Sequence, residues 1–147
     1  MTTGLEILER DDRLKGHWLL RIAAYLIDFA IIYLVLWVPS LILSRYFWVF
    51  TSAAGLTMFL YCSIMEASSG GTLGKLILGL RTTSFSGPLD IQKTVMRNIS
   101  KVFPVLMLLD VIFGLATEGD PRQKYTDRIS GTLVVEKQHL TPVSPEP

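Results

Sequence analysis

Charged residues inside apolar segments are the features of this sequence most able to do chemistry. Arg21 and Asp28 lie in one long apolar run, Glu66 closes the next, and Asp110 lies inside a third. An ionised group at membrane depth costs several kcal/mol when unpaired, so we expect a pairing or functional role. Carboxylates supply hard oxygen ligands and exchangeable protons, and Asp28, Asp110 and Glu66 are therefore candidates for a hydrated cation or proton site. Two plainer interpretations stay open: Glu66 marks the end of a helix, and Asp110 lies near a surface.

Arg21 and Asp28 are seven residues apart, nearly two helical turns, so both project from one face with Tyr25 between them. Along the axis they are ~10 Å apart, too far for a compact ion pair. We therefore expect the partner of Asp28 on another element, with Arg97, Lys101 and Arg128 as candidates. Arg21 has the further option of extending to lipid phosphates.

The sequence offers no set of residues for enzymatic catalysis. His17 and His139 lie near opposite ends, and neither a histidine–carboxylate metal motif nor a nucleophile–base pair is present. The glycine-rich stretch 69–75 lacks the glycine and hydroxyl positions of a phosphate-binding loop. Without a basic arm or patch, no nucleic acid is expected as a partner. We expect no enzyme activity, no metal and no cofactor.

The elements that must position these residues are membrane-spanning helices. Half of the 147 residues are hydrophobic and only 18% are charged. Residues 18–43 would extend roughly 39 Å as a helix, enough to cross a ~30 Å hydrocarbon core, with Pro39 as a possible kink or end. Residues 46–65 contain no charge and fit a second crossing, with a small-residue face at 51–55. The lipid bilayer is thus the first expected partner.

The third apolar region, 102–117, is short for a complete crossing and begins beside Pro104. Residues 80–85 and 131–135 have strand character, and two isolated strands need each other to satisfy their backbone groups. We favour a broken or re-entrant third element bent near Pro104, with both strands on the cytoplasmic side; three plain crossings are the alternative. The predicted fold class is an all-α membrane protein, a small transmembrane helical bundle with a short two-strand pairing.

Basic residues flank the two firm crossings unevenly, which predicts a cytoplasmic N-terminus in the cell membrane. Before the first crossing and after the second lie Arg10, Arg13, Lys15, Lys75, Arg81, Lys93, Arg97 and Lys101, against Arg45 alone in the loop between them. We divide the chain into a cytoplasmic segment (1–16), a membrane domain (17–136) and a disordered tail (137–147).

Three blocks of this sequence resemble the RDD family of small bacterial and archaeal membrane proteins. The matching blocks are residues 21–28 (RIAAYLID), 71–81 (GTLGKLILGLR) with Arg97, and 125–135 (YTDRISGTLVV). The resemblance implies that Arg21, Asp28 and Asp127 are the arginine and two aspartates that name the family. It further implies motif roles for Thr72, Gly74, Lys75, Gly131 and Thr132. Thr126 departs from the family pattern, which often has histidine there, and this weakens a mechanism that needs an imidazole beside Asp127.

The family is suspected of transporting small solutes or ions, with cation/proton exchange proposed within it. We therefore expect transport of a small solute or cation, possibly proton-coupled, by a homo-oligomer, because one copy has too few helices to enclose a pathway. The expected ion, proton or solute site comprises Asp28, Arg21, Asp127, Arg97, Asp110 and Glu66. The alternative is a non-transporting membrane scaffold or accessory subunit that docks a partner through its cytoplasmic face.

Overall fold

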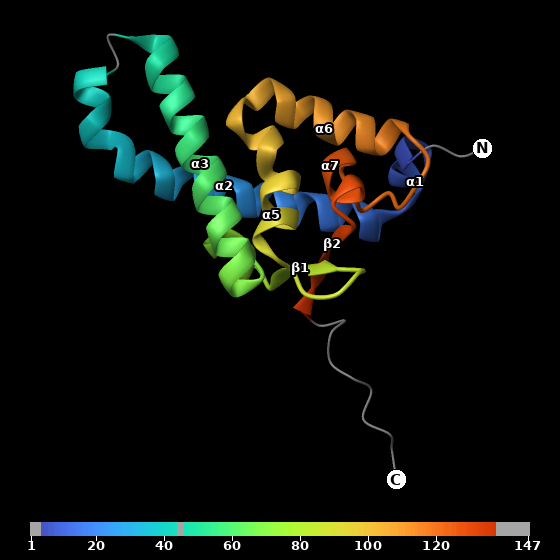
Figure 1. Ribbon diagram of the computed structural model, residues 1–147. Helices are drawn as coiled ribbons and strands as arrows, with labels where there is room; N and C mark the ends of the chain where they lie inside the picture. Colours follow the sequence, from blue (N-terminus) through green and yellow to red (C-terminus); the bar gives the residue numbers. More distant parts are fainter. Residues whose placement is uncertain (1–3, 44–45, 138–147) are drawn as a thin grey trace.

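The computed structural model describes residues 4–43 and 46–137. Arg45, used in the orientation argument, and all of the expected tail except Lys137 lie outside these residues. The order of elements is shown in Figure 1, where two long helices and a bent helix pair surround a small sheet and several short helices.

The two predicted crossings are confirmed as helices long and apolar enough to span a membrane. Helix α2 is Asp12–Leu43 and α3 is Phe47–Ser69. Helix α2 begins earlier than predicted, and Pro39 does not end it. Helix α3 stops at Gly70, which adopts a left-handed conformation (φ 71°) and donates its N–H to the Glu66 carbonyl oxygen. That conformation is inexpensive only for glycine, so the chain turns sharply here.

The third apolar element is broken, as predicted. Helix α5 (Ile91–Asn98) continues into the 3₁₀ turn η1 (Ile99–Val102), and after Phe103 helix α6 (Pro104–Ala116) leaves at 114°. Pro104 stands in the first turn of α6, where its missing N–H has no partner to lose. Because the bend exceeds a right angle, α6 runs partly back along the direction of α5.

The predicted strand pairing is confirmed. Strands β1 (Leu80–Ser84) and β2 (Thr132–Glu136) pair antiparallel with Thr82 opposite Val134. Strand β1 precedes the bent pair and β2 follows it. The pairing therefore brings both ends of the bent pair to one side of the molecule, which favours a re-entrant element over a third full crossing.

Three short helices complete the structure: α1 (Gly4–Arg10), α4 (Leu73–Ile77) and α7 (Tyr125–Ile129). Helices α1 and α7 were not predicted from the sequence. Thr72 caps α4 by accepting from the Lys75 N–H. Helix α1 covers a core cluster of Leu14, Trp18 and Leu115.

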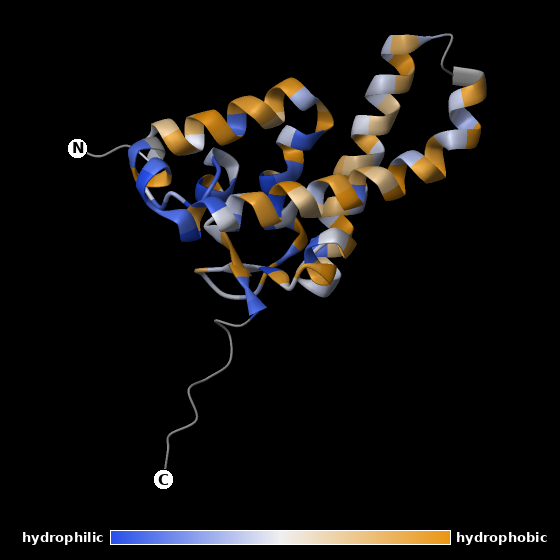
Figure 2. Ribbon diagram, turned by 180° about the vertical axis from the view of Figure 1, so that it is seen from behind, coloured by the Kyte–Doolittle hydropathy of each residue, from blue (hydrophilic) through white to orange (hydrophobic). Residues whose placement is uncertain are grey.

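Hydrophobic residues make up most of the long helices and of α6, which are largely orange in Figure 2. Leu34 and Leu41 of α2, Trp48 of α3 and Leu108 of α6 are all strongly exposed. In contrast, polar and charged side chains fill much of the interior between α2, α5 and α7. This inversion of the usual soluble arrangement suits a lipid environment.

Candidate functional site

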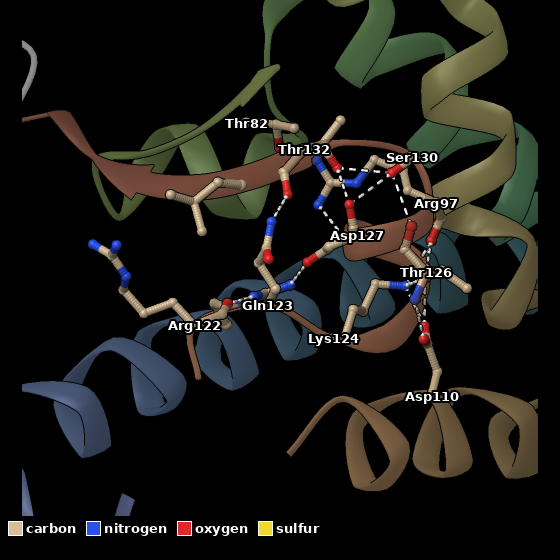
Figure 3. A network of polar contacts seen from close by, with 12 residues as sticks. Thr82, Arg97, Asp110, Arg122, Gln123, Lys124, Thr126, Asp127, Ser130 and Thr132 are labelled. Atoms are coloured by element: carbon tan, nitrogen blue, oxygen red, sulfur yellow. Dashed lines mark hydrogen bonds and ion pairs between the residues drawn. The ribbon is translucent and has the colours of Figure 1, made fainter. Parts of the chain in front are cut away.

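The charged residues of the apolar segments meet those of the short helices in one buried network, part of which is drawn in Figure 3. Its acidic members are Asp28, Glu66, Asp110 and Asp127, all buried. Its basic members are Arg21, Lys75, Arg97 and Lys124. Buried charges persist only when they are paired or hydrogen-bonded, and three of the four carboxylates are held by cations.

Asp127, on α7, joins two arginines. Arg21 of α2 donates to its Oδ2 over 2.7 Å, and Arg97 Nη2 of α5 lies 2.9 Å from its Oδ1. Burial alone would raise the pKa of Asp127, but Arg97, Arg21 and Lys124 outweigh it and hold that pKa well below the ordinary value. Arg21 also donates to the Arg122 carbonyl oxygen over 2.6 Å. Asp127 therefore ties three elements together as an anion.

Glu66, at the end of α3, holds the other half of the network. Lys75 Nζ of α4 donates to Oε1, Asn98 Nδ2 donates to Oε2 over 2.9 Å, and Arg97 Nε lies 3.4 Å from Oε2. Burial lowers the pKa of Lys75 to about 7, although the Glu66 carboxylate opposes that shift. Lys75 can therefore exchange a proton near neutral pH.

Asp110 connects α6 to the start of α7. Lys124 Nζ donates to Oδ2, as does Ser100 Oγ over 2.6 Å. Thr126 binds the same carboxylate twice, through its N–H to Oδ1 and its hydroxyl to Oδ2, each over 2.7 Å. The position that departs from the family pattern is thus occupied by a hydroxyl that bridges α7 to α6 (Figure 3).

Asp28 differs from the other three carboxylates. Its Oδ1 accepts from the Tyr61 hydroxyl over 2.9 Å and from the Gly74 N–H over 2.8 Å. Among residues 4–43 and 46–137 no lysine or arginine forms an ion pair with it. The expectation of a partner among Arg97, Lys101 and Arg128 is therefore wrong. The start of α4 comes close enough to α2 for a backbone N–H to reach the carboxylate instead.

Arg97 and Arg128, two of those proposed partners, are engaged elsewhere. Arg97 bridges Glu66 and Asp127, as described above. Arg128 donates to the carbonyl oxygens of Gly114 and Glu118 and to the Thr117 hydroxyl. Lys101 lies beside the Cys62 thiol. Cys62 itself is buried, as expected of a small hydrophobe.

A cavity of about 250 Å³ lies between α2 and the bent pair, and the network forms its floor. Asp28 and five basic residues line the polar part: Arg21, Lys75, Arg97, Lys101 and Lys124. The apolar part is lined by Trp18, Ile22, Pro104, Met107, Leu108 and Val111. An apolar wall with converging polar groups is typical of small-molecule sites, while the volume lies just below their usual range of roughly 300–1,000 Å³.

The structure does not gather the predicted carboxylates into a cation site. In the described part of the chain no three histidine, cysteine, aspartate or glutamate residues are placed to hold a metal ion, so Asp28, Glu66 and Asp110 form no such group. Each is bound by a different set of neighbours. Asp28 itself lines the cavity, whereas Glu66 and Asp110 pair with Lys75 and Lys124, which line it.

The remaining motif residues shape the network without contributing charge. A Cβ atom at Gly74 would overlap the carbonyl oxygen of Ala24, so only glycine lets α4 approach α2 this closely. Gly131 has φ 61° at the turn into β2. Thr132 is fully buried, exchanging a 2.9 Å hydrogen bond with Ser130, and its carbonyl oxygen accepts from Gln123 Nε2 over 2.6 Å.

Sequence reasoning missed four members of the site: Tyr61, Asn98, Lys124 and Thr126 as a ligand of Asp110. Tyr61 and Asn98 lie on predicted helices, but Tyr61 is five residues from Glu66 and Asn98 is adjacent to Arg97, so helical spacing does not place either beside those charges. Lys124 lies in a polar stretch where nothing in the local pattern separates it from a solvated lysine.

Comparison with known proteins identifies one family. The sequence model of the RDD family matches residues 15–131, which is most of the chain. No curated protein and no solved structure matches it. The matched range includes all of the network described above.

Proposed function

The chain belongs to the RDD family and is a membrane protein, and from this premise we propose that it carries a small solute or cation across the membrane, coupled to protons. The cavity between α2 and the bent pair is the solute site in this proposal. Asp28 is the proton-carrying carboxylate.

The observation that carries the proposal is the isolation of Asp28. It lines the cavity, and two neutral donors bind it where the other buried carboxylates have cations. A cation at contact distance holds a carboxylate in its ionised form, and among the described residues Asp28 is the buried carboxylate of the network without such a cation. A buried carboxylate that can change charge in a membrane cavity is the usual means of coupling solute movement to protons.

The ion pairs around Asp28 support this role by holding the floor rigid. Arg21, Arg97 and Lys124 are engaged by Asp127, Glu66 and Asp110. Lys75, whose pKa of about 7 allows proton exchange near neutrality, lines the same cavity and is the second group able to relay a proton. The site thus combines three carboxylates that are fixed in ion pairs and a fourth, Asp28, which no cation pairs with among the described residues.

We further propose that the working unit is a homo-oligomer in the cell membrane, with the N-terminus cytoplasmic. One copy supplies two helices that can cross a membrane, or three if the bent pair counts as a span. Two or three helices pack against each other and leave no enclosed path, so several copies are needed to surround one.

Proton flux in proteoliposomes tests this function. The purified protein, Asp28→Asn and the matched control Asp12→Asn are compared for dye-reported pH changes after pulses of sodium, potassium, lithium or candidate solutes. Asp12 lies on the same helix but is exposed and pairs with Lys15, so its loss should leave flux intact. We expect flux in the intact protein and in Asp12→Asn, and none in Asp28→Asn. Solute-driven flux that persists in folded Asp28→Asn would contradict the role of this carboxylate.

A second candidate function is a scaffold or accessory subunit that docks a partner. A surface hollow of about 590 Å³ favours it, lined by the start of α2, the 120–122 loop and β2. If folded protein shows no flux above empty liposomes, a partner that co-purifies from native membranes and is lost in Arg122→Glu would support this reading.

A further inference from the structure

We propose that the cavity binds an amphiphilic anion, with the acidic head against Lys101 and Arg97 and the apolar tail leaving between Ile22 and Leu108. This proposal names the class of solute that would be transported, and it rests on the proposed transport function only for the reason why the protein would bind that solute. Binding itself is a separate property and is tested separately.

The charges around the cavity favour an anion over a cation. Five basic residues line it, against the single carboxylate of Asp28. Arg21, Lys75, Arg97 and Lys124 are balanced by carboxylates beneath the surface, but Lys101 forms no ion pair among the described residues. An ammonium group in a low-dielectric wall is stabilised by an incoming anion and repels an incoming cation.

Arg97 offers the second anchor. Its side chain is 1% exposed, it lines the cavity, and its Nη1 atom has no hydrogen-bond acceptor. Because Nη1 is itself buried, Arg97 acts on an anion in the cavity through its positive charge, which a low-dielectric wall makes stronger. Arg97 is in α5 and Lys101 is in the 3₁₀ turn that follows it, and both line the cavity.

The opposite wall of the cavity is apolar and leads outward. Ile22 of α2 is 53% exposed and Leu108 of α6 is 64% exposed, and both line the cavity. In a membrane protein such exposed apolar residues face lipid, so the mouth opens toward hydrocarbon and not toward water. A small hydrated ion would lose its water in this mouth without compensation, whereas an alkyl or aryl tail would lose nothing.

Trp18 lines the cavity and can report on its occupant. With Trp37→Phe and Trp48→Phe, it becomes the sole tryptophan of the full-length chain. The probe is a brominated long-chain fatty acid at mildly alkaline pH, compared with its uncharged methyl ester, since bromine quenches tryptophan fluorescence on contact. We expect saturable quenching by the acid at concentrations where the ester has little effect.

Variants at Lys101 test the anchor without breaking an ion pair of the network. Lys101→Met should weaken the binding of the acid by about tenfold or more, and Lys101→Arg should retain it. Lys15→Met, on the exposed start of α2, is the matched control and should bind normally. Equal quenching by acid and ester, or full binding in Lys101→Met, would overturn the proposal.

Two sources of such an anion are separable. In nanodiscs, brominated phosphatidylglycerol is compared with brominated phosphatidylcholine; selective quenching by the former identifies a resident anionic lipid, and quenching by added fatty acid alone identifies a free ligand. Selective binding of the anion without proton flux would support this proposal and contradict the transport function. Cation-driven flux without selective binding would support the transport function and contradict this proposal.

Discussion

Arg97 is the residue on which the buried charges depend, because it lies between Glu66 and Asp127 and contacts both. The three residues come from α5, α3 and α7, so their pairing fixes the relative position of three helices. A buried ion pair is weak evidence for added stability, but removing one partner leaves an uncompensated charge. The network therefore determines how the three helices are placed more than it adds to the free energy of unfolding.

Loss of the Asp127 charge should destabilise the protein strongly. Asp127→Asn leaves Arg21 and Arg97 without their carboxylate in a buried site, and we expect a loss of about 3–5 kcal/mol in unfolding free energy. Denaturant unfolding in detergent measures this. The control is Asp120→Asn, whose partly exposed pair with Arg122 should cost roughly 1 kcal/mol or less. Equal losses of unfolding free energy in the two variants would contradict a special cost of breaking the buried ion pairs.

Acid should destabilise the protein through the same carboxylate. The pKa of Asp127 is lower in the folded state than its ordinary value of 3.8, so its stabilisation is complete above pH 3.8 and is lost as pH falls through the folded pKa. Unfolding free energy should therefore fall with pH below 3.8 in the intact protein, and less steeply in Asp127→Asn. The measurement is denaturant unfolding across this pH range; parallel curves for the two proteins would contradict it.

At this scale the sequence predicted the members of the site better than their pairing. Arg21, Asp28, Glu66 and Asp110 were singled out as charges in apolar segments, and Arg97 as a candidate partner. Their partners were not deducible, because Arg21 and Asp127 are 106 positions apart and no local spacing connects them. Asp127 itself stood out only through the family resemblance, since a lone acid in a polar stretch has no local signal of burial.

Among the elements, α4 is the one whose position decides the geometry at Asp28. It lies against α2 because Gly74 has no side chain, and its Gly74 N–H and Leu73 N–H then reach Asp28 and the Tyr61 hydroxyl. The same device recurs between α3 and the 3₁₀ turn, where a Cβ at Gly55 would overlap the Val102 carbonyl oxygen. Small residues thus permit the close contacts that hold the polar interior together.

A methyl group at position 74 should push α4 away from α2. We expect Gly74→Ala to lower the thermal unfolding midpoint in detergent and to abolish the activity that depends on Asp28, because the carboxylate loses its backbone donor. Gly16→Ala is the control: nothing lies within 4 Å of its Cβ, and inside a helix the change should be neutral or stabilising by about 1 kcal/mol. Gly74→Ala with an unchanged midpoint and activity would refute the packing role.

The long elements were predictable from length and hydropathy alone, and the strands from their composition between turn residues. The break at Pro104 followed from the restricted chemistry of proline. Helices α1 and α7 were missed because each is a short turn or two of mixed polarity, whose helical state depends on packing against α2, α5 and α6. Only the tertiary structure could supply that information.

For the whole molecule, the paired strands join the segment before the bent pair to the segment after it, since β1 precedes α5 and β2 follows α6. Helix α1 packs against α6. The end of α2 and the start of α3 lie together, away from the sheet (Figure 1). The fold is therefore a pair of helices able to cross a membrane together with a bent helix pair, and a re-entrant course of that bent pair is our prediction.

Single cysteines in a Cys62→Ser background test this arrangement. Glu9→Cys and Lys137→Cys should react with an impermeant maleimide from one side of the membrane, and Tyr46→Cys from the other; all three positions are exposed. The native side of Glu9 also tests the proposed orientation. Labelling of Lys137→Cys from the same side as Tyr46→Cys would establish the bent pair as a full crossing.

The 106-residue separation of Arg21 and Asp127 also determines how long Arg21 lacks its partner during synthesis. At roughly 5–20 residues per second, α2 leaves the ribosome about 5–20 s before the carboxylate that neutralises its arginine exists. We expect the Arg21 turn to be held at the headgroups during that interval, with α2 completing its insertion only after α7 and β2 have been made. Ala24 packs with Val134 in the folded protein, so the reactivity of a cysteine in Ala24→Cys measures whether α2 has reached its final position. We expect this cysteine to be reactive in a ribosome-stalled chain ending at residue 123 and protected in the full chain; protection already in the stalled chain would mean that α2 settles without its partner.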